Sequence, residues 1–370
     1  MRYTVRLPLW VALLSLAPAV HADDTTAKKN ALSTTKAEAV DKAVKAEMEK
    51  QELVGVAVGV IQDGKVVYLQ GYGLADKEKK TPVTTKSVFN WASNSKPFAA
   101  VLAMQLVEKK QLGLDADVRK YVPEFPDKKV KITTRHLLDH QSGIPHYDNG
   151  KVIPIQRKYT QSDPFADPVV ALDKFADSPL LFTPGEKTSY STYAYILLSA
   201  VVQKAGDSPF AKQIDKRIVG PLKLTSFEYD TPAGKPTWVT GYEKKGGKVT
   251  AVADVAHDWK HGGGAFKSDV GDFARWAVAL INRELVSEAT EKAMWEPQPT
   301  TDGKPSTYGL GFVVEGGDRL KVSHNGKQEE TTTRLVIYPK QKSGVVVMCN
   351  CGFGDVGKIS TAVFAALAEK

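Results

Sequence analysis

The chain has 370 residues, of which 42% are hydrophobic, 25% charged and 9% aromatic, a balance that excludes disordered, collagen-like and coiled-coil proteins. The formal net charge is +8, but the lysines are spread along the chain and no basic stripe alternates with aromatic residues, so we expect no nucleic-acid partner. The only two cysteines, Cys349 and Cys351, exclude a disulfide framework and a four-cysteine zinc site. At about 150 residues per domain, the length alone suggests two domains or slightly more.

Residues 1–22 have the pattern of a Sec-type signal peptide. Arg2 and Arg6 supply positive charge, the stretch 7–20 is apolar, and the segment ends in a cleavage pattern of small residues. About 14 apolar residues are fewer than the roughly 20 that a membrane-spanning helix needs. We therefore expect export to a bacterial periplasm, with no membrane span after cleavage and a flexible lead-in at 23–36.

The next part of the chain predicts a helix, a hairpin and a second helix. Apolar residues recur every four positions over 36–50, which is typical of an amphipathic helix. The β-rich runs 53–61 and 65–70 are joined by Asp63-Gly64, a strong signal for a hairpin. A helix is expected to follow at about 94–109.

The middle of the chain, 111–260, is rich in prolines and short helical patterns. Helices are predicted in it at 133–140, 167–177, 192–205 and 209–219. The loop 143–165 shows no pattern. Ser268 is expected to cap a helix that runs through Asn282. Four strands and a last helix follow, at 308–315, 319–324, 331–338, 344–349 and 356–368.

These elements predict an α+β fold. Strands from both ends of the chain would pair into one antiparallel sheet flanked by helices, with the mostly helical segment 111–260 inserted between them. One unit over 37–370 then replaces the two domains that length suggests, with a site in the cleft between sheet and insertion. Cys349 and Cys351 lie two apart in a strand, where a disulfide would be strained, so we expect packed or free thiols.

The segment Ser93-Asn-Ser-Lys96 begins the helix after the hairpin, so Ser93 and Lys96 lie one turn apart on one face. A serine hydroxyl is a weak nucleophile unless a base takes its proton, and a nearby, partly desolvated lysine can do so. The helix N-terminus adds backbone N–H groups able to stabilise an oxyanion. The pattern alone is weak, because Ser33-Thr-Thr-Lys36 repeats it in the lead-in.

Two later segments add functional groups. Tyr190 lies where a loop meets an apolar helix, and a tyrosine there can relay a proton if a nearby cation lowers its pKa. His324-Asn-Gly326 ends one strand just before the next; its glycine would let a substrate backbone approach, and its imidazole offers a hydrogen bond near the nucleophile. Each also has a plain structural explanation, as a tyrosine over a hydrophobic cluster and a histidine at a strand end.

Taken together and in this order, Ser-x-x-Lys, Tyr190-Ser-Thr192 and His324-Asn-Gly326 resemble the serine β-lactamase and D-alanyl-D-alanine peptidase superfamily. The resemblance is to its class C branch, which carries Ser-x-x-Lys, Tyr-x-Asn and Lys/His-x-Gly. It covers about 36–370 and implies a β-lactamase/transpeptidase-like fold. Within the branch, the chain is similar to the animal mitochondrial serine β-lactamase-like proteins. Three further segments support the resemblance: 133–143, 262–268 and 308–312.

The resemblance implies a role for each matched residue. Ser93 would be the acylated nucleophile with Lys96 as its partner, Tyr190 a second base or proton relay, and His324 a member of the hydrogen-bond network. The backbone N–H groups of Ser93 and Lys327 would form the oxyanion hole. Contacts with substrate are expected from four residues: Thr192, Asn325, Gly326 and Lys327. Whether Lys96 or Tyr190 is the general base stays open.

The chain departs from the family pattern at two positions. Thr192 stands where the family has asparagine, and His324 replaces the lysine of class C β-lactamases, which leaves less fixed positive charge for a β-lactam carboxylate. Both departures favour a peptidase or esterase over antibiotic resistance. We expect an exported, peptidase-like serine hydrolase that cleaves an amide or ester through an acyl-enzyme, on small substrates that include peptidoglycan-derived peptides. The alternatives on the same fold are a carboxylesterase and a weak β-lactamase.

Two rival interpretations stay open. His136 and His140, and also His257 and His261, have the i, i+4 spacing of zinc ligands, but the glutamate of a zinc-peptidase helix is missing, so we expect no metal and no other cofactor. A non-catalytic binding or scaffolding protein is the second rival, although such a homologue usually loses at least one of the three catalytic groups. The sequence does not indicate an oligomeric state.

Overall fold

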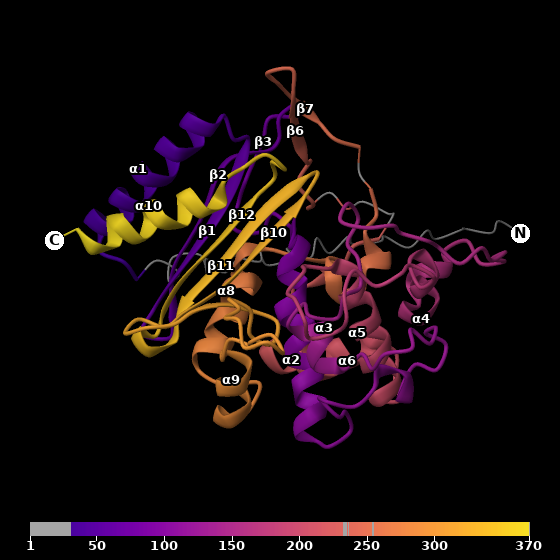
Figure 1. Ribbon diagram of the computed structural model, residues 1–370. Helices are drawn as coiled ribbons and strands as arrows, with labels where there is room; N and C mark the ends of the chain where they lie inside the picture. Colours follow the sequence, from indigo (N-terminus) through magenta and orange to yellow (C-terminus); the bar gives the residue numbers. More distant parts are fainter. Residues whose placement is uncertain (1–30, 232–234, 236, 254, 370) are drawn as a thin grey trace, which may run out of the picture.

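The structure, a computed structural model, describes residues 31–231, 235, 237–253 and 255–369. Its centre is an antiparallel sheet of seven strands in the order β3-β2-β1-β12-β11-β10-β9 (Figure 1). The strands are β1 Gly55–Gln62, β2 Lys65–Asp76, β3 Thr81–Pro82, β9 Val313–Glu315, β10 Lys321–Gln328, β11 Thr331–Tyr338 and β12 Ser343–Cys349. Because β1 pairs with β12 at the middle, both chain ends build one sheet, which confirms the predicted α+β class.

The hairpin that begins the sheet is the one predicted. Asp63 and Gly64 connect β1 to β2 with φ of 50° and 70°. Positive φ at both central residues is what a tight hairpin turn of matching twist requires, and aspartate and glycine tolerate it best.

One face of the sheet is covered by two helices, α1 Thr34–Gln51 and α10 Val356–Ala368, which lie side by side (Figure 1). Val40, Val44 and Met48 are buried against the sheet, as their spacing predicted. Every second residue of β1 faces them, beginning at Val56, and the residues between face the other side. Both cysteines are free thiols buried in this layer, as expected.

The start of α1 corrects the length of the lead-in. The predicted flexible segment 23–36 overlaps the helix, which begins at Thr34 because the Ser33 side chain caps it by accepting from the Lys36 N–H at 3.4 Å. The Lys36 ammonium donates to the Leu367 carbonyl at 3.0 Å. The second Ser-x-x-Lys pattern is therefore a helix start packed against α10. The predicted signal peptide, 1–22, lies outside the described residues.

The other face of the sheet packs against α8, Val270–Ile281. Asp269 caps this helix by accepting from the Asp272 N–H at 2.9 Å, so the prediction that Ser268 is the cap is wrong. The Ser268 hydroxyl is already used, because it accepts from the Trp91 indole N–H and donates to the Asp269 carbonyl, both at 2.8 Å.

Beyond α8 lie the helices of the inserted segment and its neighbours (Figure 1). They are α2 Ser95–Glu108, α3 Thr134–Leu138, α4 Pro168–Ala171, α5 Thr192–Ala205, α6 Phe210–Ile214, α7 Gly220–Leu222 and α9 Glu288–Met294. Short strands are also present: β4 Phe89–Asn90, β5 Glu228–Tyr229, β6 Tyr242–Lys245, β7 Lys248–Ala251 and β8 Phe266–Ser268. No helix in the described part of the chain combines the length and the apolar character that crossing a bilayer demands.

Two predicted strands have different bounds. The strand expected over 308–315 shrinks to β9, because Gly311 adopts φ of 93°, which breaks an extended chain. The strand expected to end at His324 continues to Gln328, because its backbone pairs with β11 as far as Thr331. This extension carries the whole His-Asn-Gly triplet and Lys327 along the edge of the sheet.

Candidate active site

Ser93 lies in a tight turn, Ala92–Asn94, directly before α2. The turn rests on an aromatic cluster, in which the ring of Trp91 lies 5.4 Å from that of Phe98. Ala92 has φ of 48°, in the left-handed region that an alanine rarely adopts, and its N–H donates to the Asn90 side chain at 2.6 Å. Strain of this kind persists only where the surroundings hold it, and it presents the Ser93 hydroxyl to the cleft.

The strand β10 passes directly against this turn because Gly326 has no side chain. A Cβ there would lie 2.3 Å from the Trp91 carbonyl oxygen and 2.2 Å from the Thr333 hydroxyl. In the amide orientation that matches donors with acceptors, the Asn94 side chain donates to the His324 carbonyl and accepts from the Gly326 N–H, both at 3.2 Å. The space that a side chain at Gly326 would occupy is thus filled by the Trp91 carbonyl and the Thr333 side chain.

Lys96 is fully buried beside Ser93. Its Nζ lies 3.1 Å from the Ser93 hydroxyl, 3.1 Å from the Thr192 hydroxyl and 2.7 Å from the Gly263 carbonyl oxygen. Burial, with repulsion from the Lys260 ammonium, holds the pKa of Lys96 well below its ordinary value of 10.5. A lysine with a lowered pKa can be neutral near neutral pH, and the neutral amine can accept a proton.

Tyr190 covers this amine, with its ring centroid 4.7 Å from Lys96 Nζ. Burial raises the pKa of the phenol, and hydrogen bonds with the Ser93 and Thr192 hydroxyls oppose this rise only in part. A role for Tyr190 as a base requires a nearby cation that lowers the pKa of its phenol, and a desolvated lysine that has lost its proton carries no charge with which to do so. The phenol therefore keeps its proton.

His324 reaches the site as a neutral ring. Its Nδ1 lies 2.6 Å from the Asn325 carbonyl oxygen, which can only accept, so Nδ1 carries the proton and Nε2 is left as an acceptor. Burial lowers the pKa of His324 to about 3. Its Nε2 is buried and has no partner among the described residues. The His324 ring lies 6.5 Å from that of Tyr190, and the residue lines the cleft.

Two further histidines surround Tyr190. His140 Nδ1 accepts from the Ser191 N–H at 3.1 Å, and His146 Nδ1 accepts from the Thr192 N–H at 3.2 Å. Their rings lie 4.5 Å and 5.4 Å from the Tyr190 ring. From the sequence, His140 is considered only as a zinc candidate and His146 is given no role, although His140 lies in the segment 133–143 that supports the family resemblance.

The site opens into a cleft of about 1180 Å³ between β10 and the inserted helices. Ser93, Tyr190, Thr192 and His324 line it, and so do Asn325 and Lys327, whose side chains are exposed. Six of the predicted site residues thus line one cleft, with Lys96 buried beside Ser93 and Gly326 packed against the Trp91 carbonyl. Several residues that line the cleft were not predicted from the sequence: Tyr147, Tyr193, Trp259, Lys260 and Tyr308.

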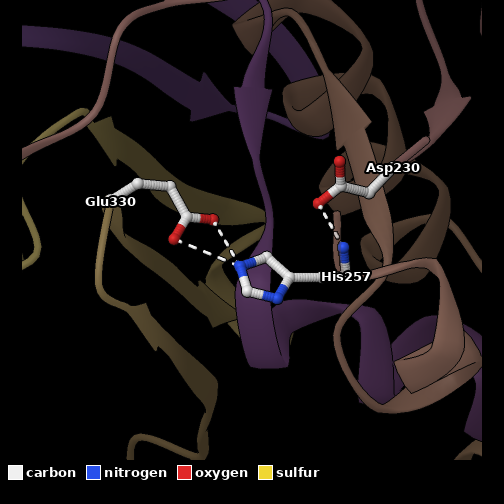
Figure 2. A group of neighbouring side chains, drawn as sticks. All are labelled: Asp230, His257 and Glu330. Carbon is white, nitrogen blue, oxygen red and sulfur yellow. Dashed lines mark hydrogen bonds and ion pairs between the residues drawn. The ribbon is translucent and has the colours of Figure 1, made fainter. Parts of the chain in front are cut away.

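The histidine pairs proposed as zinc ligands do not converge in the described chain. His136 Nδ1 accepts from the Thr133 N–H, whereas His140 faces Ser191. His261 Nε2 contacts the Phe165 carbonyl oxygen at 3.0 Å. Among the described residues, a different group brings potential metal-ligand atoms within 4.8 Å of one another: Asp230, His257 and Glu330 (Figure 2).

A serine and a buried lysine at a helix start, against the edge of an antiparallel sheet, define the chain as a serine hydrolase. It belongs to the Beta-lactamase family, whose model matches residues 40–370. It is 27% identical to the human serine beta-lactamase-like protein LACTB, mitochondrial, over 85% of this chain and 76% of that protein. It is also 27% identical to penicillin-binding protein 4* of Bacillus subtilis strain 168, over 82% of this chain and 69% of that protein.

Solved structures share the fold. EstCE1, a hydrolase with promiscuous acyltransferase activity, superposes with a TM-score of 0.78 at 20% identity, over 90% of this chain and 99% of its own. The D-amino acid amidase from Ochrobactrum anthropi SV3, in complex with D-phenylalanine, has a TM-score of 0.75 at 20% identity, again over 90% and 99%. At these identities, the likeness concerns the fold alone.

The neutral histidines predict how stability depends on pH. The pKa of His324 is about 3 in the folded protein and near its ordinary 6.5 in the unfolded chain. Between these two pH values only the unfolded chain binds a proton at this ring. The contribution of the neutral ring to the free energy of unfolding is therefore complete above pH 6.5 and is lost as the pH falls. The free energy of unfolding in urea should decline from pH 6.5 to pH 4.5 by up to about 1.4 kcal/mol per pH unit for this group. His324→Asn should decline less steeply; an unchanged slope would contradict a neutral His324.

Proposed function

We propose that the protein cleaves amide or ester bonds through an acyl-enzyme on Ser93, with Lys96 as the general base. The supporting observation is the fully buried Lys96 amine, 3.1 Å from the Ser93 hydroxyl and with its pKa well below 10.5. Tyr190 is disfavoured as the base because burial raises the pKa of its phenol. A protonated Tyr190 is instead suited to donate.

The chemistry follows from these proton positions. The neutral Lys96 amine takes the Ser93 proton while Ser93 Oγ attacks the substrate carbonyl, and the backbone N–H groups of Ser93 and Lys327 stabilise the oxyanion. The proton then passes through Tyr190 to the leaving amine or alkoxide as its bond to the carbonyl carbon breaks. Water attacks the acyl-enzyme by the same route in reverse, which frees the acid and restores Ser93.

Thr192 explains how the site works without the family's asparagine. Its hydroxyl lies 3.1 Å from Lys96 Nζ, and the residue lines the cleft, so we assign Thr192 to holding the lysine as well as to contacting substrate. A hydroxyl both donates and accepts, and can therefore serve the lysine in either protonation state.

The cleft favours a small substrate with an apolar group, peptidase-like in kind. Its walls include the rings of Tyr147, Tyr193 and Trp259, and Val255 is half exposed at its rim. Aromatic walls bind apolar side chains of D-amino-acid or other short peptides, including peptidoglycan-derived ones. A carboxylesterase is the second candidate. A neutral His324 in place of a lysine speaks against a strong β-lactamase.

Labelling of Ser93 tests the nucleophile. A fluorophosphonate or fluorescent penicillin should form one adduct at Ser93, and Ser93→Ala should lose the adduct and about 10³-fold or more of the turnover, because no other group takes its place. Ser33→Ala is the matched control, since it removes the serine of the second Ser-x-x-Lys pattern and weakens only a helix cap. Folded protein that both probes leave unlabelled would favour the non-catalytic alternative.

The pH dependence of kcat/KM distinguishes the two possible bases. If Lys96 must be neutral, the rate rises with pH through the Lys96 pKa and reaches its plateau well below pH 10.5. Tyr190→Phe should keep the position of this rise and lower kcat by about 10²-fold, the usual worth of one proton-transfer group. Lys96→Met should remove both the rise and most of the activity. Loss of the rise in Tyr190→Phe would make Tyr190 the base.

We also propose that the protein is exported through Sec to a bacterial periplasm. The support is the charged and apolar pattern of residues 1–22, together with the penicillin-binding protein among the relatives. Expressed at full length in a Gram-negative host, the protein should appear in the periplasmic fraction with its N-terminus at Asp23 by Edman sequencing. Retention of Arg2 in cytoplasmic protein would contradict export.

A further inference from the structure

We propose that Lys260 determines substrate specificity by binding an anionic group of the substrate, specifically a carboxylate. This inference deepens the proposed function, because it gives a charge to the substrate of the same cleft. Lys260 lies in the short 3-10 helical segment Asp258–Gly263, three residues before Gly263, whose carbonyl accepts from Lys96. It lines the cleft together with Ser93 and is only 9% exposed.

The Lys260 ammonium is held in place by a neutral group. Its Nζ donates to Gln328 Oε1 at 2.5 Å, and Gln328 is itself fixed because its amide N–H groups donate to Asn90 Oδ1 and the Gly264 carbonyl oxygen, both at 2.9 Å. Aromatic rings flank the charge, with centroids 5.5 Å away for Trp259 and 5.8 Å away for Tyr147. The position of the cation is therefore preorganised.

Three acids lie close enough to Lys260 to oppose the lowering of its pKa by burial: Glu330, Asp230 and Glu329, of which Glu329 is exposed to water. Glu330 faces His257, with 3.2 Å between Oε1 and Nε2 (Figure 2). Asp230 pairs with Lys267 at 2.8 Å and accepts from the Asn90 amide at 2.8 Å. Within the described ranges, no carboxylate lies within 4 Å of Lys260 Nζ. Because Lys267 already neutralises Asp230, we assign no metal ion to the group of Asp230, His257 and Glu330.

A buried ammonium without a paired acid is costly, and an anion that enters the cleft would remove that cost. Burial lowers the pKa of Lys260 only to about 8, so the group is still mostly charged at pH 7. The other cations of the cleft are less suited. Lys244 pairs with Glu52 at 2.9 Å, the Lys327 side chain is exposed to water, and Lys96 is engaged by Ser93, Thr192 and Gly263.

The test uses two matched pairs of esters that differ only in charge. The first pair is 3-carboxyphenyl and 3-carbamoylphenyl phenylacetate, with the charge on the leaving group. The second is the phenyl esters of 4-carboxyphenylacetic and 4-carbamoylphenylacetic acid, with the charge on the acyl group. For wild type we expect kcat/KM to favour the carboxylate in at least one pair by on the order of tenfold, as for a charge-assisted hydrogen bond.

The variants assign this preference to one side chain. Lys260→Met should abolish it, mainly through KM for the carboxylate, and Lys260→Arg should keep part of it. Lys244→Met is the matched control, because it removes a cleft lysine that already has an acid, and the preference should be unchanged. Absence of a preference in both wild-type pairs, or its survival in Lys260→Met, would overturn the inference.

Binding to Ser93→Ala separates this inference from the proposed function. Calorimetry with the same esters measures the charge preference without turnover, and Lys260→Met in that background should remove it. If wild type hydrolyses no ester but Ser93→Ala still binds the carboxylate member better, the proposed function fails and the anion site stands. If the neutral esters are hydrolysed but neither assay shows a charge preference, only the anion site fails.

Discussion

The burial of one ammonium group constrains the rest of this structure. Lys96 is wholly removed from water, and a charge in that position is costly unless it is solvated by protein or gives up its proton. Its partners, Ser93, Thr192 and the Gly263 carbonyl, come from three segments that are far apart in the chain. The same burial lowers the pKa of Lys96, so the cost of the arrangement is also the source of its reactivity.

The fold brings the segments that surround Lys96 together from both ends of the chain. The N-terminal half supplies the turn with Ser93 and the helix with Lys96, whereas β10 comes from the C-terminal part of the sheet. Gly326 lets β10 and the turn touch, and Asn94 bridges them. The start of α5, from the inserted segment, and the loop of Gly263 directly after that segment close the third side, so that the site lies where these parts meet.

Around the lysine, the surroundings carry little charge. Burial keeps the rings of His146 and His324 neutral, with pKa values of about 4 and about 3. Tyr190 holds its proton for the same reason. In such low-dielectric surroundings a single charge acts strongly over several ångströms, which is why Lys260 both repels the charged form of Lys96 and is suited to attract an anion.

Local patterns in the sequence determined much of the fold and the core of the site. Periodicity and turn chemistry predicted α1 and the hairpin at Asp63-Gly64, because these depend on neighbours within a few residues. The strand patterns at both ends of the chain also suggested the shared sheet, although its central pair, β1 with β12, joins residues far apart in the chain. The Ser-x-x-Lys motif with Tyr190 and His324 pointed to the cleft. Only the tertiary structure decided that Asp269 caps α8, that Tyr190 stays protonated and that Lys260 lacks an acid. Caps compete for partners across the fold, and the pKa of a group depends on burial and charges contributed by distant segments.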